Sequence, residues 1–165
     1  MAKQTSGTTH ADPKAKAQPQ ASTEVPPEFA IQKIYVKDFS FEAPHTPDIF
    51  RVEWKPKPQA DINVTYEKIE DGVYEVRLKI TLTAKVDEKV AFLVEVQQAG
   101  IFTVNHFPED QKERLLRAYC ANILFPYARE VITNKIVNGG FPPLYLAPIN
   151  FEAIYQQEKD QRGSG

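Results

Sequence analysis

The sequence predicts an α+β fold in which a four-stranded antiparallel sheet is followed by a long helix and a shorter C-terminal helix. Two observations support this prediction. Between about residues 29 and 98 apolar and polar residues alternate, as in half-buried strands, whereas from about residue 108 apolar residues recur every three or four positions, as on one helix face. Strands that all precede the helices are typical of α+β folds.

Two alternating runs predict a hairpin. From Tyr74 to Ala84 every second residue is apolar, and the residues between them are charged or carry a hydroxyl group, which is the pattern of a strand with one buried face. A similar run spans residues 62–67. Asp71 and Gly72 lie between the two runs and tolerate the positive φ of a tight turn, so we expect the runs to pair.

Two further strands complete the predicted sheet. Residues 90–98 follow a turn expected at 87–89, and we expect the sheet to end near Ile101, where the alternation stops. The two faces of this strand differ: Val90, Phe92, Val94 and Val96 share one, whereas Leu93 lies with Glu95 on the other. A first strand is expected at about residues 29–41. The proline-rich segment 43–58 that follows it cannot form a regular ladder, so we expect a crossover loop there.

A long helix is predicted from about Pro108 to Asn138. Its apolar stripe consists of Leu115, Leu116, Tyr119, Ile123, Tyr127, Val131, Ile132 and Ile136. Gly139 and Gly140 can adopt the left-handed conformation that ends a helix. Pro126 falls inside the helix, where its missing N–H and its clash with the carbonyl four residues earlier predict a kink or an interruption.

The chain is expected to form one domain, residues 29–155, between two polar segments. Residues 1–28 contain no aromatic residue, so they cannot bury enough apolar surface to offset the entropy of ordering, and we predict a disordered arm. Asn150 is placed to cap the second helix, which would run through Tyr155. The polar residues 156–165 are expected to form a flexible tail.

Composition excludes several classes of function. A chain of 165 residues with 42% hydrophobic residues can build one real core, and a formal charge of −2 gives no basic surface for nucleic acid. The sequence has neither an apolar run of about 18 residues nor the apolar region of a secretory signal. Its single cysteine cannot form an intramolecular disulfide. We therefore expect a cytoplasmic protein.

The residues that carry catalysis or bind metals are scattered along the sequence. His10, His45 and His106 have no neighbours at metal-ligand or triad spacing, and Cys120 lies near the apolar helix stripe, where a buried, inert thiol is usual. The glycines at 139–140 follow a helix, whereas a phosphate-binding loop precedes one. We expect no enzymatic activity, no cofactor and no metal. An enzyme would need titratable groups that converge only in space.

The aromatic residues suggest a binding surface. Taken singly, each ring is explained by the core or by an oligomer interface, but Phe50 and Trp54 lie in the proline-rich crossover loop. Loops run over the surface and often carry function, so we expect these rings to line a groove. Leu93 beside Glu95 would form an apolar spot on a charged strand face, which is typical of protein contacts. The pattern favours binding of polypeptide through shape and hydrophobicity.

Four segments resemble the SecB protein-export chaperone family. They are YVKDFSFEAPHTPDIF at 35–50, FLVEVQQAGIF at 92–102, CANILFPYARE at 120–130 and GGFPPLYLAPINFEA at 139–153. The resemblance covers about residues 30–155 and implies subunits of the predicted fold assembled as homotetramers, dimers of dimers. It also implies an ATP-independent chaperone that holds secretory precursor proteins unfolded in the cytoplasm and passes them to SecA, the motor ATPase of the translocase.

The resemblance also implies roles for individual residues. The positions that match SecA contacts are Asp38, Glu42, Leu93 and Glu95, an acidic patch for the basic, zinc-bearing tail of SecA, where the zinc belongs to the partner. Candidates for the client groove are Trp54, Ile62, Val64, Phe102, Phe125 and Tyr145, and candidates for subunit pairing are Val94, Val96 and Gln98. The alternative is a SecB-like chaperone dedicated to one partner, such as a toxin–antitoxin component.

Overall fold

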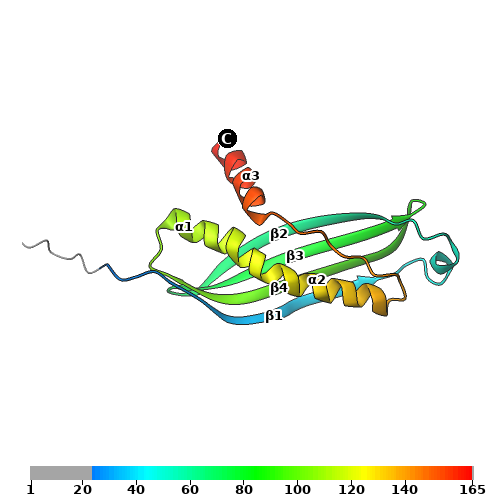
Figure 1. The fold of residues 1–165 in the computed structure, drawn as a ribbon, viewed down its shortest axis with the longest axis horizontal. Helices are drawn as coiled ribbons and strands as arrows, with labels where there is room; N and C mark the ends of the chain where they lie inside the picture. Colours follow the sequence, from blue (N-terminus) through cyan, green and yellow to red (C-terminus); the bar gives the residue numbers. More distant parts are fainter. Residues whose placement is uncertain (1–23, 165) are drawn as a thin grey trace, which may run out of the picture.

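A computed structural model describes residues 24–164 of the chain. Its four strands form one antiparallel sheet in the order β1-β4-β3-β2, with a layer of helix across one face (Figure 1). The strands are β1 (Glu28–Glu42), β2 (Lys57–Glu70), β3 (Val73–Val86) and β4 (Lys89–Asn105). The predicted fold class is therefore confirmed. Most of the predicted N-terminal arm, residues 1–23, lies outside the described part of the chain.

Both predicted tight turns are present. Gly72, between β2 and β3, has a φ of 74°, and a Cβ atom there would lie 2.8 Å from Cγ of Asn105. Asp87 and Glu88 join β3 to β4 with φ values of 48° and 64°, as a two-residue hairpin turn requires. The expected end of the last strand near Ile101 was wrong. β4 continues to Asn105 because its final residues pair with the beginning of β1 and with β3.

The helical layer is nearly continuous but contains one irregular turn. Helix α1 (Glu109–Arg114) passes into a π-helical turn at Leu115–Tyr119 and then into α2 (Cys120–Asn138). The predicted interruption at Pro126 does not occur, because α2 runs through this residue and the irregular turn lies earlier in the sequence. The predicted glycine stop is confirmed: Gly140 has a φ of 88°, and the amide of Phe141 donates to the carbonyl of Ile136.

Helix α3 (Phe151–Gly163) extends further than the sequence predicted. Its predicted cap is confirmed, since Oδ1 of Asn150 accepts a hydrogen bond from the amide of Ala153 at 3.0 Å. Residues 156–163, expected to form a flexible tail, continue the helix. Figure 1 shows α3 standing away from the sheet, connected to α2 by an extended segment.

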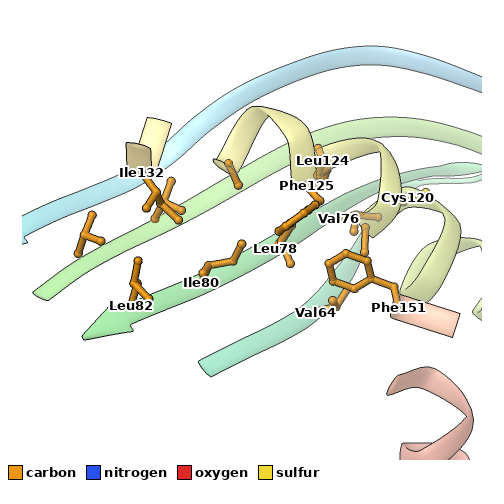
Figure 2. Close-up of a cluster of buried hydrophobic side chains, with 14 of the residues drawn as sticks. Val64, Val76, Leu78, Ile80, Leu82, Cys120, Leu124, Phe125, Ile132 and Phe151 are labelled. Carbon is orange, nitrogen blue, oxygen red and sulfur yellow. The ribbon is translucent and has the colours of Figure 1, made fainter. Parts of the chain in front are cut away.

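The core lies between the inner face of the sheet and helix α2 (Figure 2). The alternating residues of β3 supply one side of it, including Val76, Leu78, Ile80 and Leu82, and Leu116, Leu124, Ile132 and Ile136 supply the other. Each fully buried aliphatic side chain stabilises the fold by about 1.5–3 kcal/mol. Tyr119 and Tyr127, assigned to the same helix stripe by their spacing, are instead about half exposed. No helix in the described part of the chain is long and apolar enough to cross a membrane.

Candidate functional site

An aromatic cluster lies where the crossover loop meets the end of α2. The loop carries a short 3₁₀ helix at Asp48–Arg51. Phe141, which follows the glycine stop, is nearly buried, and its ring centroid lies 5.0 Å from that of Phe50, 5.1 Å from Phe92 and 5.5 Å from Trp54. Aromatic pairs at these separations attract one another beyond their simple burial. Phe141 therefore holds the loop against the sheet.

The outer side of this cluster is an open hollow, here called the aromatic cleft. It has a volume of about 320 Å³ and is lined by Ile49, Phe50, Val52, Trp54, Gly140, Phe141 and Pro142. Phe50 is 49% exposed and Val52 is 45% exposed. The lining is almost entirely apolar, which suits apolar side chains of a partner and offers no group for acid–base or nucleophilic chemistry.

The two glycines before Phe141 make room for these rings. A Cβ atom at Gly139 would overlap the ring of Phe41, and one at Gly140 would lie 3.2 Å from Cζ of Phe50. Gly140 also needs its positive φ, which side-chain-bearing residues rarely adopt. The two glycines thus end the helix, and Gly140 also forms part of the wall of the aromatic cleft.

The crossover loop is held to the sheet by a side-chain contact of His45 and is closed on itself by a backbone hydrogen bond. The ring Nδ1 of His45 lies 3.0 Å from the carbonyl oxygen of Val90, and the amide of Ile49 donates to the carbonyl of His45 at 2.8 Å. Ile49 is buried beneath the loop. These contacts fix the base of the loop, whereas Phe50 and Val52 at its outer surface stay exposed.

The structure separates the six predicted groove residues. Trp54 lines the aromatic cleft, and Tyr145, 71% exposed, borders a second hollow of about 460 Å³ beside α2. Ile62 is half-buried on β2. Val64, Phe102 and Phe125 lie in the core of the single chain, with exposed fractions of 8%, 0% and 6%, and so present almost no surface to a partner.

The four predicted SecA-contact residues do come together. Glu42 pairs with Leu93 across β1 and β4, and Glu95 pairs with Ser40 two positions along, so all four side chains lie on the sheet face opposite α2. Glu95 lies 3.3 Å from Nζ of Lys79 and accepts a hydrogen bond from Thr81. Within residues 24–164, Asp38 and Glu42 are exposed and make no ion pair.

A charged network lies further along this outer face. Oε1 of Glu75 lies 2.7 Å from Nζ of Lys37 and 3.4 Å from Nη1 of Arg77. The carboxylate of Glu75 also accepts a hydrogen bond from the hydroxyl of Tyr35. Burial opposes the charge on Glu75, but the bonds from Lys37 and Tyr35 outweigh it and lower the pKa of this carboxyl. Burial and the bond to Glu75 raise the pKa of Tyr35 to about 12.

The three predicted subunit-pairing residues lie in the core. Val94 and Val96 have no exposed surface, and Gln98 is 2% exposed. The side-chain amide of Gln98 donates to the carbonyl of Tyr35 at 3.0 Å, while its Oε1 has no hydrogen-bond partner within residues 24–164. These residues can affect assembly only by shaping the strands around them.

Sequence reasoning missed an apolar band on β1 and the adjoining helix. Ile31, Val36, Tyr119 and Tyr127 are each 45–49% exposed, and β1 is an edge strand of the sheet. We call these four residues the β1–α2 band, although Tyr119 is the last residue of the π-helical turn directly before α2. The alternation in β1 was too irregular to identify its exposed side, because the strand contains two bulges, after Ile31 and after Val36.

The single cysteine lies outside both surfaces. Cys120 begins α2 and has no exposed surface. Burial raises the pKa of its thiol to about 12, so the thiol is neutral at physiological pH and is a poor nucleophile. The expectation of a buried cysteine is confirmed.

Together these features define an α+β protein with a SecB-like sheet-and-helix topology, an apolar cleft on one side of its sheet and an acidic patch on the other. The family model for the preprotein translocase subunit SecB matches residues 22–162, and the chain belongs to this family. The protein-export protein SecB of Methylococcus capsulatus is 51% identical over 79% of this chain and 84% of its own length. The protein-export protein SecB of Idiomarina loihiensis is 56% identical over 82% of this chain and 81% of its own length.

A solved structure has the same fold. It is the SecB-like chaperone of Mycobacterium tuberculosis in complex with a ChAD peptide from an antitoxin, with a TM-score of 0.62 over 73% of this chain and 90% of that one. The two sequences are 15% identical, so the likeness concerns the fold alone.

Proposed function

We propose that this chain is an export chaperone that holds secretory precursor proteins unfolded in the cytoplasm, without nucleotide, and delivers them to SecA. The export function is supported by the family and by relatives named protein-export protein SecB that share about half of their residues with this chain. The observation that carries the mode of binding is the aromatic cleft, in which the ring of Phe50 stays about half exposed although it packs on Phe141.

The aromatic cleft would bind clients weakly and without sequence specificity. A client side chain that enters it gains roughly 25 cal/mol for each Å² of apolar surface removed from water, whatever its sequence context. Several clefts in one assembly would engage a single extended chain, and effective concentration would raise the total affinity. Clients that fold quickly hide the same apolar surface and escape, so selection is kinetic.

Refolding of a slow-folding precursor tests the holding activity. Excess chaperone should slow the recovery of native precursor, and removal of the chaperone should restore the rate. A precursor variant that folds quickly serves as the control and should be little affected. If the slow precursor refolds at the same rate with and without excess chaperone, the chain does not hold clients.

Delivery would use the acidic patch of Asp38, Glu42, Leu93 and Glu95. Its exposed carboxylates suit a basic partner segment, and the half-buried Leu93 adds apolar contact beside them. Because this patch and the aromatic cleft lie on opposite faces of the sheet, SecA could dock on the outer face while a client remains bound.

Assembly as a dimer of dimers would cover the β1–α2 band. A long edge strand with exposed apolar side chains tends to pair with another chain unless something covers it, and a second copy would supply both the strand and the apolar surface. Sedimentation should give a mass near four chains. Tyr127→Asp, on the exposed side of α2, should shift the mass downwards, and a monodisperse wild-type monomer would contradict the proposed assembly.

A further inference from the structure

The last two turns of helix α3 are attached to the rest of the chain by charge. Apolar packing of α3 is confined to its beginning, where Phe151 and Tyr155 are buried and the ring of Phe151 meets that of Phe125 edge-on at 5.8 Å. No side chain is buried between residues 156 and 163. In Figure 1 this half of the helix points away from the sheet.

Four side chains form a linked set of ion pairs between α3 and the helix layer. Nη1 of Arg162 lies 3.1 Å from Oε1 of Glu113, and the same oxygen lies 3.2 Å from Nε of Arg117. Nη1 of Arg117 lies 3.7 Å from Oε2 of Glu158. The set contains two acids and two bases, and we call it the α3 latch.

Arg117 also reaches the sheet. Its Nη1 donates to the carbonyl of Val64 at 3.4 Å, and its guanidinium lies over the ring of Tyr66, 5.2 Å from the centroid. Both residues belong to β2, the edge strand opposite β1. A charged side chain held against an edge strand is one of the ways in which proteins keep such strands from pairing with other chains.

We infer that Arg117 is a positioning residue that couples the docking of α3 to the closure of the β2 edge. The two ends of the α3 latch on α3, Arg162 and Glu158, are about half exposed, and ion pairs that reach water are individually weak and are screened by salt, so the last two turns of α3 undock readily. Undocking removes Glu158 from Arg117 and Arg162 from Glu113, so only Glu113 and Tyr66 still hold the guanidinium, which can turn towards Glu113 and away from the carbonyl of Val64. The opened strand offers backbone hydrogen-bonding groups to an extended polypeptide, which adds to the sheet as a further strand.

The occupant of the opened edge is an extended segment of an unfolded client, and this step rests on the proposed function. β2 begins at Lys57, directly after the crossover loop that carries Trp54. A client chain that leaves the aromatic cleft can therefore continue along β2. The α3 latch would control the second part of this path and leave the cleft itself unchanged.

Arg162→Gln opens the α3 latch at an exposed position far from the core. Lys159→Gln is its control, because it makes the same change of charge on the same helix and Lys159 forms no ion pair in the described part of the chain. Backbone amide exchange, measured by mass spectrometry in low salt, should rise about two- to fivefold in both 156–163 and 62–66 for Arg162→Gln. Lys159→Gln should match the wild type, and Arg162→Lys should restore most of the protection.

High salt should raise the exchange of the wild type in both segments and change Arg162→Gln little further. If Arg162→Gln and Lys159→Gln exchange alike, the α3 latch does not hold the helix. If only 156–163 responds, docking is not coupled to the β2 edge. These measurements need no client, so they are independent of the proposed function.

A client arm then tests access to the edge. Arg162→Gln should capture a fluorescent unfolded peptide about two- to fivefold faster than Lys159→Gln at low salt, and an equal rate would overturn the role in access. A wild type that captures no peptide would overturn the proposed function and the client step together. The exchange measurements would still decide whether the α3 latch holds the helix and the β2 edge.

Discussion

Phe50→Ala should weaken client binding more than it weakens the fold. A phenylalanine side chain buries about 150–250 Å² when it is fully covered, and Phe50 is 49% exposed, so about 100 Å² of ring surface remains for a client to cover. At about 25 cal/mol per Å² that surface contributes at most about 2.5 kcal/mol. Since alanine keeps a small part of the contact, we expect a loss of about 1–2 kcal/mol, or about five- to thirtyfold in affinity.

The only tryptophan of the chain provides the assay. Trp54 lines the aromatic cleft beside Phe50, so its fluorescence should change when an apolar unfolded peptide binds. Anisotropy of a labelled peptide gives the affinity independently. Val25→Ala is the matched control, because Val25 is an exposed apolar residue, 61%, that precedes β1 and lies outside both the aromatic cleft and β2.

Two results would refute the reasoning about Phe50. Equal affinities for Phe50→Ala and Val25→Ala would mean that clients bind elsewhere or through general surface hydrophobicity. A loss of affinity accompanied by a large fall in unfolding free energy would mean that the ring acts through the fold. We expect a fall of only about 1–2 kcal/mol, because the ring is half exposed and its main aromatic contact is with Phe141, at 5.0 Å.

Three further predictions concern charge and ionisation. With its pKa raised to about 12 by burial, the Cys120 thiol should resist alkylation in the native protein at pH 8 and react fast in denaturant; equal rates would contradict its burial. The raised pKa of Tyr35 contributes stability that is fully present below pH 10 and is lost as the pH rises to about 12, so Tyr35→Phe should flatten this alkaline loss in denaturant titrations. Asp38→Lys with Glu95→Lys should abolish SecA association in calorimetry while tetramer mass and client affinity stay unchanged; unaltered SecA affinity would remove the patch assignment.

Local pattern predicted the sheet well because each strand has one buried face. The buried residues of β3 are the ones that the alternation selected, and Asp71–Gly72 forms the expected turn. The end of β4 was missed because Ile101 and Phe102 are both apolar although they point to opposite faces, so the alternation seemed to stop where the pairing continues.

The candidate site was predicted only in part, since its shape depends on contacts between distant segments. The proline-rich loop marked Phe50 and Trp54 as surface rings, and both line the aromatic cleft. Phe141 carries no local signal beyond the two glycines before it, because its burial requires the chain after α2 to fold back on the crossover loop. Phe102 looked like a groove residue by position, but the absence of a side chain at Gly100 leaves room for its ring inside the core.

The two proposed binding surfaces lie back to back on the same stretch of the sheet. Phe41 and Phe92 face the helix side, where their rings stack at a centroid distance of 6.2 Å beneath the aromatic cleft. Their neighbours Glu42 and Leu93 pair with each other and face outwards in the acidic patch. Because side chains alternate between faces along a strand, the proposed function would have one stretch of β1 and β4 serve a client on one side and a basic partner on the other. A single-residue shift of the β1–β4 register would turn the side chains of β1 to the opposite face, so both surfaces depend on the same strand pairing.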